Sequence, residues 1–156
     1  NHITEKIQSY PGVIGVHDLM IHDYGPGNLF ATVHVEFPAE TPVIEAHEIM
    51  DEIERDFQKQ EHMILTIHYD PIVEESEEVA EIRTFVSQSA KELDERLSIH
   101  EVRLVPGKES SNVIFDCVKP AGFKISDSEI TSYLQKRVTE WNPRYRCVIK
   151  VEQSYV

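Results

Sequence analysis

Apolar side chains in the first forty residues follow two different spacings. Apolar residues three and four positions apart over residues 3–10 predict a short amphipathic helix. Alternating patterns over residues 15–23 and 30–37 predict two half-buried strands. Gly and Pro residues at 25–28 predict the turn between them. This stretch is therefore predicted to form a helix followed by a β-hairpin.

A longer helix and a third strand complete the first half of the chain. Thr41 is the expected N-cap and Pro42 the expected first helical residue. An apolar stripe carries the predicted helix to about residue 60. Residues 63–70 alternate again, and Pro71 is expected to end this strand.

The same order recurs in the second half. Residues 73–97 are rich in Glu but carry apolar residues at helical spacing, which predicts a charged helix rather than a flexible linker. Strands are predicted at 99–105 and 112–119. The capping box at 126–129 opens another helix, and residues 146–151 form the last strand. This recurrence indicates an internal duplication.

Three pairs of segments keep the same register in the two halves: 16–19 with 99–102, 33–38 with 115–120, and 65–70 with 147–152. A strand–helix–strand step crosses over right-handed, so its two strands are parallel in a mixed sheet. The predicted fold is α+β, a ferredoxin-like αββαβ open-faced sandwich present twice. Residues 1–72 form the first domain, 73–97 the connecting first helix of the second copy, and 98–156 the rest of that copy.

The two cysteines fit this scheme as core residues. Cys117 and Cys147 fall at the core-facing places of Val35 and Leu65, where free cysteine packs like a small apolar side chain. Two cysteines are too few for a disulfide scaffold, so we expect a reducing cytosolic compartment.

The net charge of the chain makes some classes of binding partner unfavourable. There are 15 Lys and Arg residues against 28 Asp and Glu residues, and the net charge is -13. This excess disfavours nucleic acid and anionic membrane surfaces as partners. No apolar run approaches the length of a membrane span, and no signal peptide is evident. Because the chain begins at Asn1 rather than Met, we expect an excised fragment of a longer protein.

The acidic residues and the histidines gather in the first half. Residues 1–72 hold 13 acids, 3 bases and seven of the eight histidines. His68 and Asp70 share one face of a predicted strand, and His34 lies on the non-core face of another. Imidazole and carboxylate together favour Zn²⁺ and accept several other divalent ions. Scattered surface histidines are the competing explanation, because no compact metal-binding motif is present.

Four separated motifs in this half, at residues 11–19, 33–36, 45–54 and 67–71, resemble the cytosolic C-terminal domain of the cation diffusion facilitator family. These proteins are divalent-metal efflux transporters. The resemblance implies a metallochaperone-like fold, a homodimer, a membrane domain before Asn1, and a place on the cytoplasmic side of the membrane. It also implies Zn²⁺ near or between the protomers, with Co²⁺, Ni²⁺, Cd²⁺, Fe²⁺ or Mn²⁺ as alternatives. The family's metal ligands match His17, His34, His47, His68 and Asp70.

The second copy departs from this ligand pattern. His100, Asp116, Lys150 and Glu152 stand in the places of His17, His34, His68 and Asp70, and the place of His47 falls near Ser132. A lysine among the prospective ligands repels a cation. We therefore expect the second copy to keep the fold without the metal site.

The function expected from these patterns is a cytosolic regulatory domain that binds metal, dimerises and thereby gates a transporter. One alternative is a purely structural dimerisation module. A zinc hydrolase is the other, but the sequence contains no nucleophile elbow, phosphate loop or metalloprotease motif. We therefore do not expect an enzyme.

Overall fold

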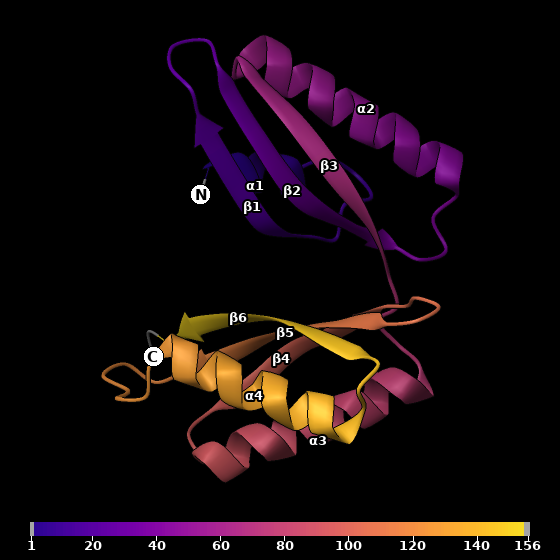
Figure 1. The fold of residues 1–156 in the computed structure, drawn as a ribbon. Coiled ribbons are helices and arrows are strands. Elements are labelled where there is room, and N and C mark those ends of the chain that lie inside the picture. Colours follow the sequence, from indigo (N-terminus) through magenta and orange to yellow (C-terminus); the bar gives the residue numbers. More distant parts are fainter. Residues whose placement is uncertain (1, 155–156) are drawn as a thin grey trace. The chain divides into compact units, whose positions relative to one another are not determined.

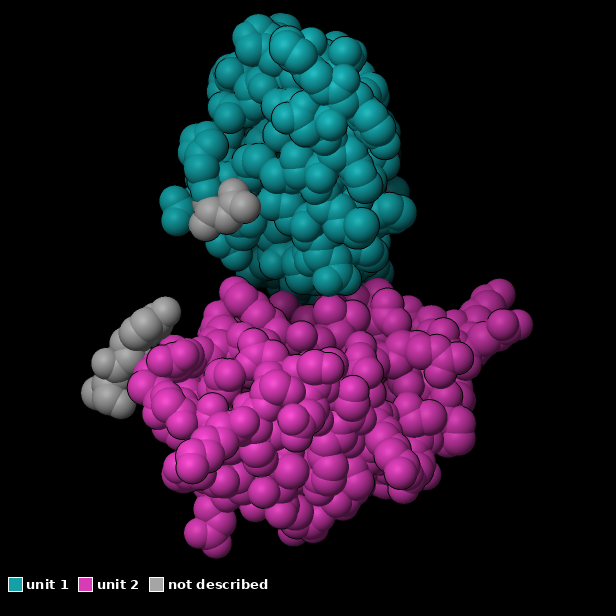
Figure 2. Space-filling model, turned by 60° about the vertical axis from the view of Figure 1, so that its left-hand side comes forward, with its two compact units in different colours: residues 1–72 teal, residues 73–156 magenta. Residues whose placement is uncertain are grey.

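The computed structural model describes residues 2–154, and the chain divides into two compact units at Ile72 and Val73 (Figure 2). Unit 1 comprises residues 1–72 and unit 2 comprises residues 73–156. Within the described residues, no helix has both the length and the apolar character that a membrane span needs.

Unit 1 contains α1 (His2–Gln8), β1 (Gly15–Asp23), β2 (Leu29–Pro38), α2 (Val43–Gln60) and β3 (Met63–Ile72) (Figure 1). Its three strands form one sheet in the order β1-β2-β3. β1 pairs antiparallel with β2, and β2 pairs parallel with β3. The predicted α+β class and the parallel strand–helix–strand step are confirmed.

One face of this sheet carries the core of unit 1. Val33, Val35 and Phe37 alternate along β2 and are fully buried. They belong to the same apolar cluster as Ile7 of α1 and Phe57 of α2, so both helices cover this face. These helices do not cover the other face of the sheet, which carries polar side chains and is called the open face below.

Two predicted boundaries in unit 1 are wrong by a few residues. Thr41 is not the N-cap: α2 starts at Val43, and its N-cap residue Pro42 makes no side-chain capping bond. Pro71 does not end β3 but lies within it, opposite Phe37. β3 is an edge strand, and proline is tolerated at an edge because no partner needs its missing N–H.

A β-bulge interrupts β1 between His17 and Met20, where Asp18 has a φ of 52°. An uninterrupted alternation would place His17 on the same face as Leu19. Val16 and Leu19 instead both pack against the core, and His17 pairs with His34, whose neighbours Val33 and Val35 face the core. The bulge therefore turns His17 to the open face of the sheet.

Unit 2 contains α3 (Glu77–Leu93), β4 (Ser98–Val105), β5 (Ser111–Lys119), α4 (Asp127–Trp141) and β6 (Tyr145–Gln153). Its sheet has the order β4-β5-β6 with the same antiparallel and parallel pairings as unit 1. It also has the same bulge, between His100 and Arg103, with Glu101 at a φ of 55°. The two units thus share backbone irregularities as well as element order.

The helix predicted over residues 73–97 is shorter in the structure, since α3 covers only Glu77–Leu93 and Val73 forms a β-bridge with Leu104. The start of α4 and the cysteines match their expected roles. Ser126 accepts a hydrogen bond from the backbone N–H of Glu129, as the capping box predicts. Cys117 is fully buried and Cys147 partly buried, and both are free thiols. Burial raises their pKa values to about 11 and about 12, respectively, which keeps them protonated and unreactive.

The bulge yields a prediction about stability. Asp18→Val places a β-branched residue at a left-handed backbone position, so we expect it to cost about 1–2 kcal/mol of folding free energy. Asp18→Gly, which accepts that conformation, should change the free energy by less than about 0.5 kcal/mol. Urea unfolding followed by circular dichroism measures both. Equal losses in the two variants would show that the backbone conformation at residue 18 is not constrained.

Candidate metal centre

Three histidines lie side by side across the open face of unit 1. His17 pairs with His34 across β1 and β2, and His34 pairs with His68 across β2 and β3. The rings of His17 and His34 are stacked at 4.8 Å between centroids, and so are those of His34 and His68. This histidine row is the product of strand register, because its members come from three separate strands.

The neighbouring row supplies carboxylates. It consists of Gly15, Glu36 and Asp70, which are register partners across the same three strands. Glu36 and Asp70 are only 1% and 6% exposed. Buried carboxylates need partners, and the adjacent imidazoles provide them.

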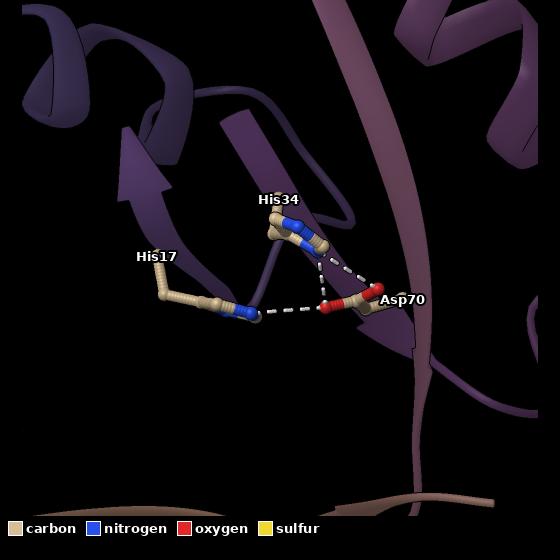
Figure 3. A group of neighbouring side chains, drawn as sticks. All are labelled: His17, His34 and Asp70. Carbon is tan, nitrogen blue, oxygen red and sulfur yellow. Dashed lines mark hydrogen bonds and ion pairs between the residues drawn. The ribbon is translucent and has the colours of Figure 1, made fainter. Parts of the chain in front are cut away.

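Asp70 contacts both His17 and His34 (Figure 3). Its Oδ2 atom is 3.1 Å from Nε2 of His17 and 3.2 Å from Nδ1 of His34. Among the described residues, His17, His34 and Asp70 form a group whose ligand atoms all lie within 4.8 Å of one another. The structure thus brings together three of the five ligands predicted from the sequence.

Two of the three separations between these atoms are close to those around a tetrahedral ion. Zn²⁺ binds nitrogen and oxygen at about 2.0–2.1 Å, so two of its ligands lie about 3.3 Å apart. The contacts of Asp70 with His17 and His34 are close to that separation. Two imidazoles and a carboxylate would hold such an ion and leave a fourth position for water or another ligand.

Glu36 is the member of the site that the sequence reasoning did not select. Its Oε2 atom lies 2.9 Å from Nδ1 of His17, on the side of the ring away from Asp70. A signal was available, because Glu36 follows His34 by two residues just as Asp70 follows His68. That spacing places a carboxylate one row beyond each histidine on the same face.

The two acids fix the protonation of His17. Burial by itself would lower the pKa of this imidazole, but hydrogen bonds to Asp70 and Glu36 and their negative charges raise it to about 9. Without a metal, His17 therefore carries a positive charge between two carboxylates at neutral pH.

The remaining two predicted ligands lie outside this group. His68 stacks on His34, but its nitrogens are not among the three clustered ligand atoms. His47 is exposed on α2, 3.6 Å from Asp51. Since α2 packs on the core face of the sheet, His47 does not join the cluster within one protomer.

The matching row of unit 2 has different chemistry. His100, Asp116 and Lys150 are register partners there. Nζ of Lys150 forms an ion pair with Glu152 at 3.0 Å. Burial and a hydrogen bond to Glu101 raise the pKa of Asp116 to about 6. Among the described residues of unit 2, no three potential ligands cluster as in unit 1.

Comparison with known families points to unit 1. Residues 1–72 match the family model described as "Cation efflux protein, cytoplasmic domain", which confirms the resemblance seen in the sequence. Residues 73–156 lie outside that match.

Curated relatives show the same relationship. The cation-efflux pump FieF of Yersinia enterocolitica is 42% identical over 53 residues, covering 34% of this chain and 17% of that protein. FieF of Pectobacterium atrosepticum is 37% identical over 71 residues, covering 45% and 23%. The chain thus spans about a fifth of the length of these relatives.

Solved structures of C-terminal domains are also similar. A variant of MamM-CTD is 25% identical, with a TM-score of 0.41, over 46% of this chain and 87% of that one. The metal-bound C-terminal domain of the CzcD transporter from Cuprividus metallidurans is 28% identical, with a TM-score of 0.37, over 44% and 93%.

The raised pKa of His17 gives the metal-free chain a pH-dependent stability. A pKa of about 9 in the folded state against about 6.5 in the unfolded state stabilises the fold fully below about pH 6.5. This contribution is lost as the pH rises through about 9, and it amounts to at most about 3 kcal/mol. Urea unfolding in the presence of a chelator measures the decline. His17→Gln, which cannot titrate, should flatten it, and an equally steep decline in that variant would contradict the assignment to His17.

Proposed function

We propose that unit 1 is the cytoplasmic regulatory domain of a divalent-cation efflux transporter and that it binds Zn²⁺ through His17, His34 and Asp70. The observation that carries the proposal is the three-ligand cluster with its 3.1 and 3.2 Å contacts. It lies within the residues that match the cytoplasmic domain of cation efflux proteins. Co²⁺, Ni²⁺, Cd²⁺, Fe²⁺ and Mn²⁺ are the alternative ions, since the same donors accept them.

In this proposal, metal binding strengthens a homodimer. Residues 1–72 hold 13 acids against 3 bases, so two such units repel each other until cations reduce the charge. The face that carries the histidine row also exposes Met20, Phe30 and Ile64, which occupy the rows next along the sheet. Apolar side chains exposed beside the cluster support this face as the dimer contact.

His68 and His47 belong to the proposal as additional ligands. His68 adjoins the cluster in the histidine row, while His47 is exposed on α2 away from it. Within one protomer neither completes the coordination at Asp70. We assign them to further ions whose remaining ligands come from the second protomer.

Transport gating follows from this linkage. If metal binds more tightly when the two cytoplasmic domains are in contact than when they are apart, it shifts the equilibrium towards the state in which they are in contact. The membrane part that would respond is proposed to precede residue 1. Unit 2 is proposed to be a diverged second copy that retains the fold and has lost the metal site. The competing proposal is a structural dimerisation module without physiological metal.

The metal site is tested by calorimetric titration of Zn²⁺ into the full chain. The His34→Ala/Asp70→Ala variant should bind Zn²⁺ more than about 100-fold more weakly than the unaltered chain. Loss of an outer-shell partner of a metal ligand lowers metal affinity by about 10–100-fold, and loss of two ligands should lower it further. The matched control is Asp116→Ala/Glu152→Ala, which changes the equivalent positions of unit 2 and should bind as the unaltered chain does. Identical heats in all three proteins would rule out the site.

The dimer is tested by sedimentation velocity with and without metal. We expect Zn²⁺ to tighten self-association by at least about tenfold relative to the same protein with a chelator, an effect worth about 1.4 kcal/mol. The His34→Ala/Asp70→Ala variant should not respond. Equal association in chelator and in Zn²⁺ would instead favour the structural dimerisation module.

A further inference from the structure

We infer that Glu36 is the positioning residue of this metal centre: it holds His17 through Nδ1 so that Nε2 is directed at the ion. The inference rests on the proposed metal-binding function and adds to it a residue that touches no metal. Three independent observations support it: the hydrogen bond itself, the glycine beside it, and the arrangement at the same place in unit 2.

The first observation is a part-buried hydrogen bond between Glu36 and Nδ1 of His17. Glu36 is 1% exposed, and its Oε2 lies 2.9 Å from Nδ1 of His17. A carboxylate at Nδ1 requires a proton on that nitrogen. In a metal-bound, singly protonated ring, the lone pair must then be on Nε2, the atom 3.1 Å from Asp70.

The second observation is the space that Gly15 provides. Gly15 is the register partner of Glu36, and a Cβ at residue 15 would lie 2.9 Å from the carboxylate carbon of Glu36. That distance is too short for van der Waals contact, so any larger residue would displace the carboxylate. Glycine at residue 15 therefore keeps Glu36 within reach of His17.

The third observation comes from unit 2, which lacks the ligand cluster. Ser98 and Val118 stand there in the places of Gly15 and Glu36. Val118 cannot accept a hydrogen bond, and Oγ of Ser98 lies 2.9 Å from Nε2 of His100. The histidine of unit 2 is thus held by the opposite ring nitrogen, the one that His17 directs at Asp70. The carboxylate, the glycine and the ligand cluster occur together in unit 1 and are absent together from the described part of unit 2.

The test uses three variants of the full chain. Glu36→Leu removes the acceptor, and we expect Zn²⁺ affinity to fall about 10–100-fold, as for other outer-shell partners of ligating histidines. Glu36→Gln keeps an oxygen that can accept from Nδ1 and should restore the affinity to within about tenfold of the unaltered chain. Gly15→Ala leaves Glu36 in place chemically but displaces its carboxylate, so its affinity should also fall.

A structural role alone would not produce the second readout, the tautomer of His17. In the zinc-loaded chain, nitrogen NMR should show a proton on Nδ1 and metal on Nε2, and the glutamine variant should show the same. In Glu36→Leu the single bound form should be replaced by a mixture. Ile53→Val provides the stability control, because Ile53 is fully buried in the same unit on the core face. It should lose stability without losing Zn²⁺ affinity.

The outcomes separate the two proposals. If the unaltered chain binds no Zn²⁺, the proposed function fails, and the role of Glu36 fails with it. If the unaltered chain binds Zn²⁺ and Glu36→Leu binds it equally well with the same His17 tautomer, the positioning role alone is overturned.

Discussion

A single extra residue in β1 determines which side chains meet on the open face of the first sheet. Because of the bulge at Asp18, His17 does not lie on the same face of the sheet as Leu19. It lies on the open face, beside His34. Without the bulge, Asp70 would face one histidine rather than two. The candidate site therefore depends on backbone geometry before it depends on any side-chain chemistry.

The strand pairings supply the rest of the arrangement. Parallel pairing of β2 with β3 places His34 beside His68 and Glu36 beside Asp70, so imidazoles and carboxylates form adjacent rows. Each carboxylate is nearly inaccessible to water and is stabilised through His17. In the metal-free chain a proton on His17 offsets this buried negative charge, and a divalent cation would offset it instead.

The sequence was sufficient to predict the elements and their order, because apolar periodicity distinguishes helices from strands in both halves. It also predicted the parallel pairing, since a strand–helix–strand step has one common topology. It could not place His17, because a bulge changes the face of a side chain without a reliable mark in the letters. Nor could it separate His47 from the cluster, since that depends on which face of the sheet α2 covers. The spacing of Glu36 from His34 matched that of Asp70 from His68, but the burial of Glu36 and its contact with His17 appear only in the structure.

The bulge has a further consequence, because unit 2 contains it as well. Glu101 has the same left-handed backbone conformation as Asp18, and His100 occupies the place of His17. The bulged backbone that turns a histidine to the open face is thus present in both units, whereas the neighbouring side chains that could complete a metal site are present, among the described residues, only in unit 1. Exchange of a few residues in two adjacent rows is enough to gain or lose the candidate ligands while the backbone stays the same. A chain with two such scaffolds can carry a row of candidate ligands on one open face and different side chains on the other.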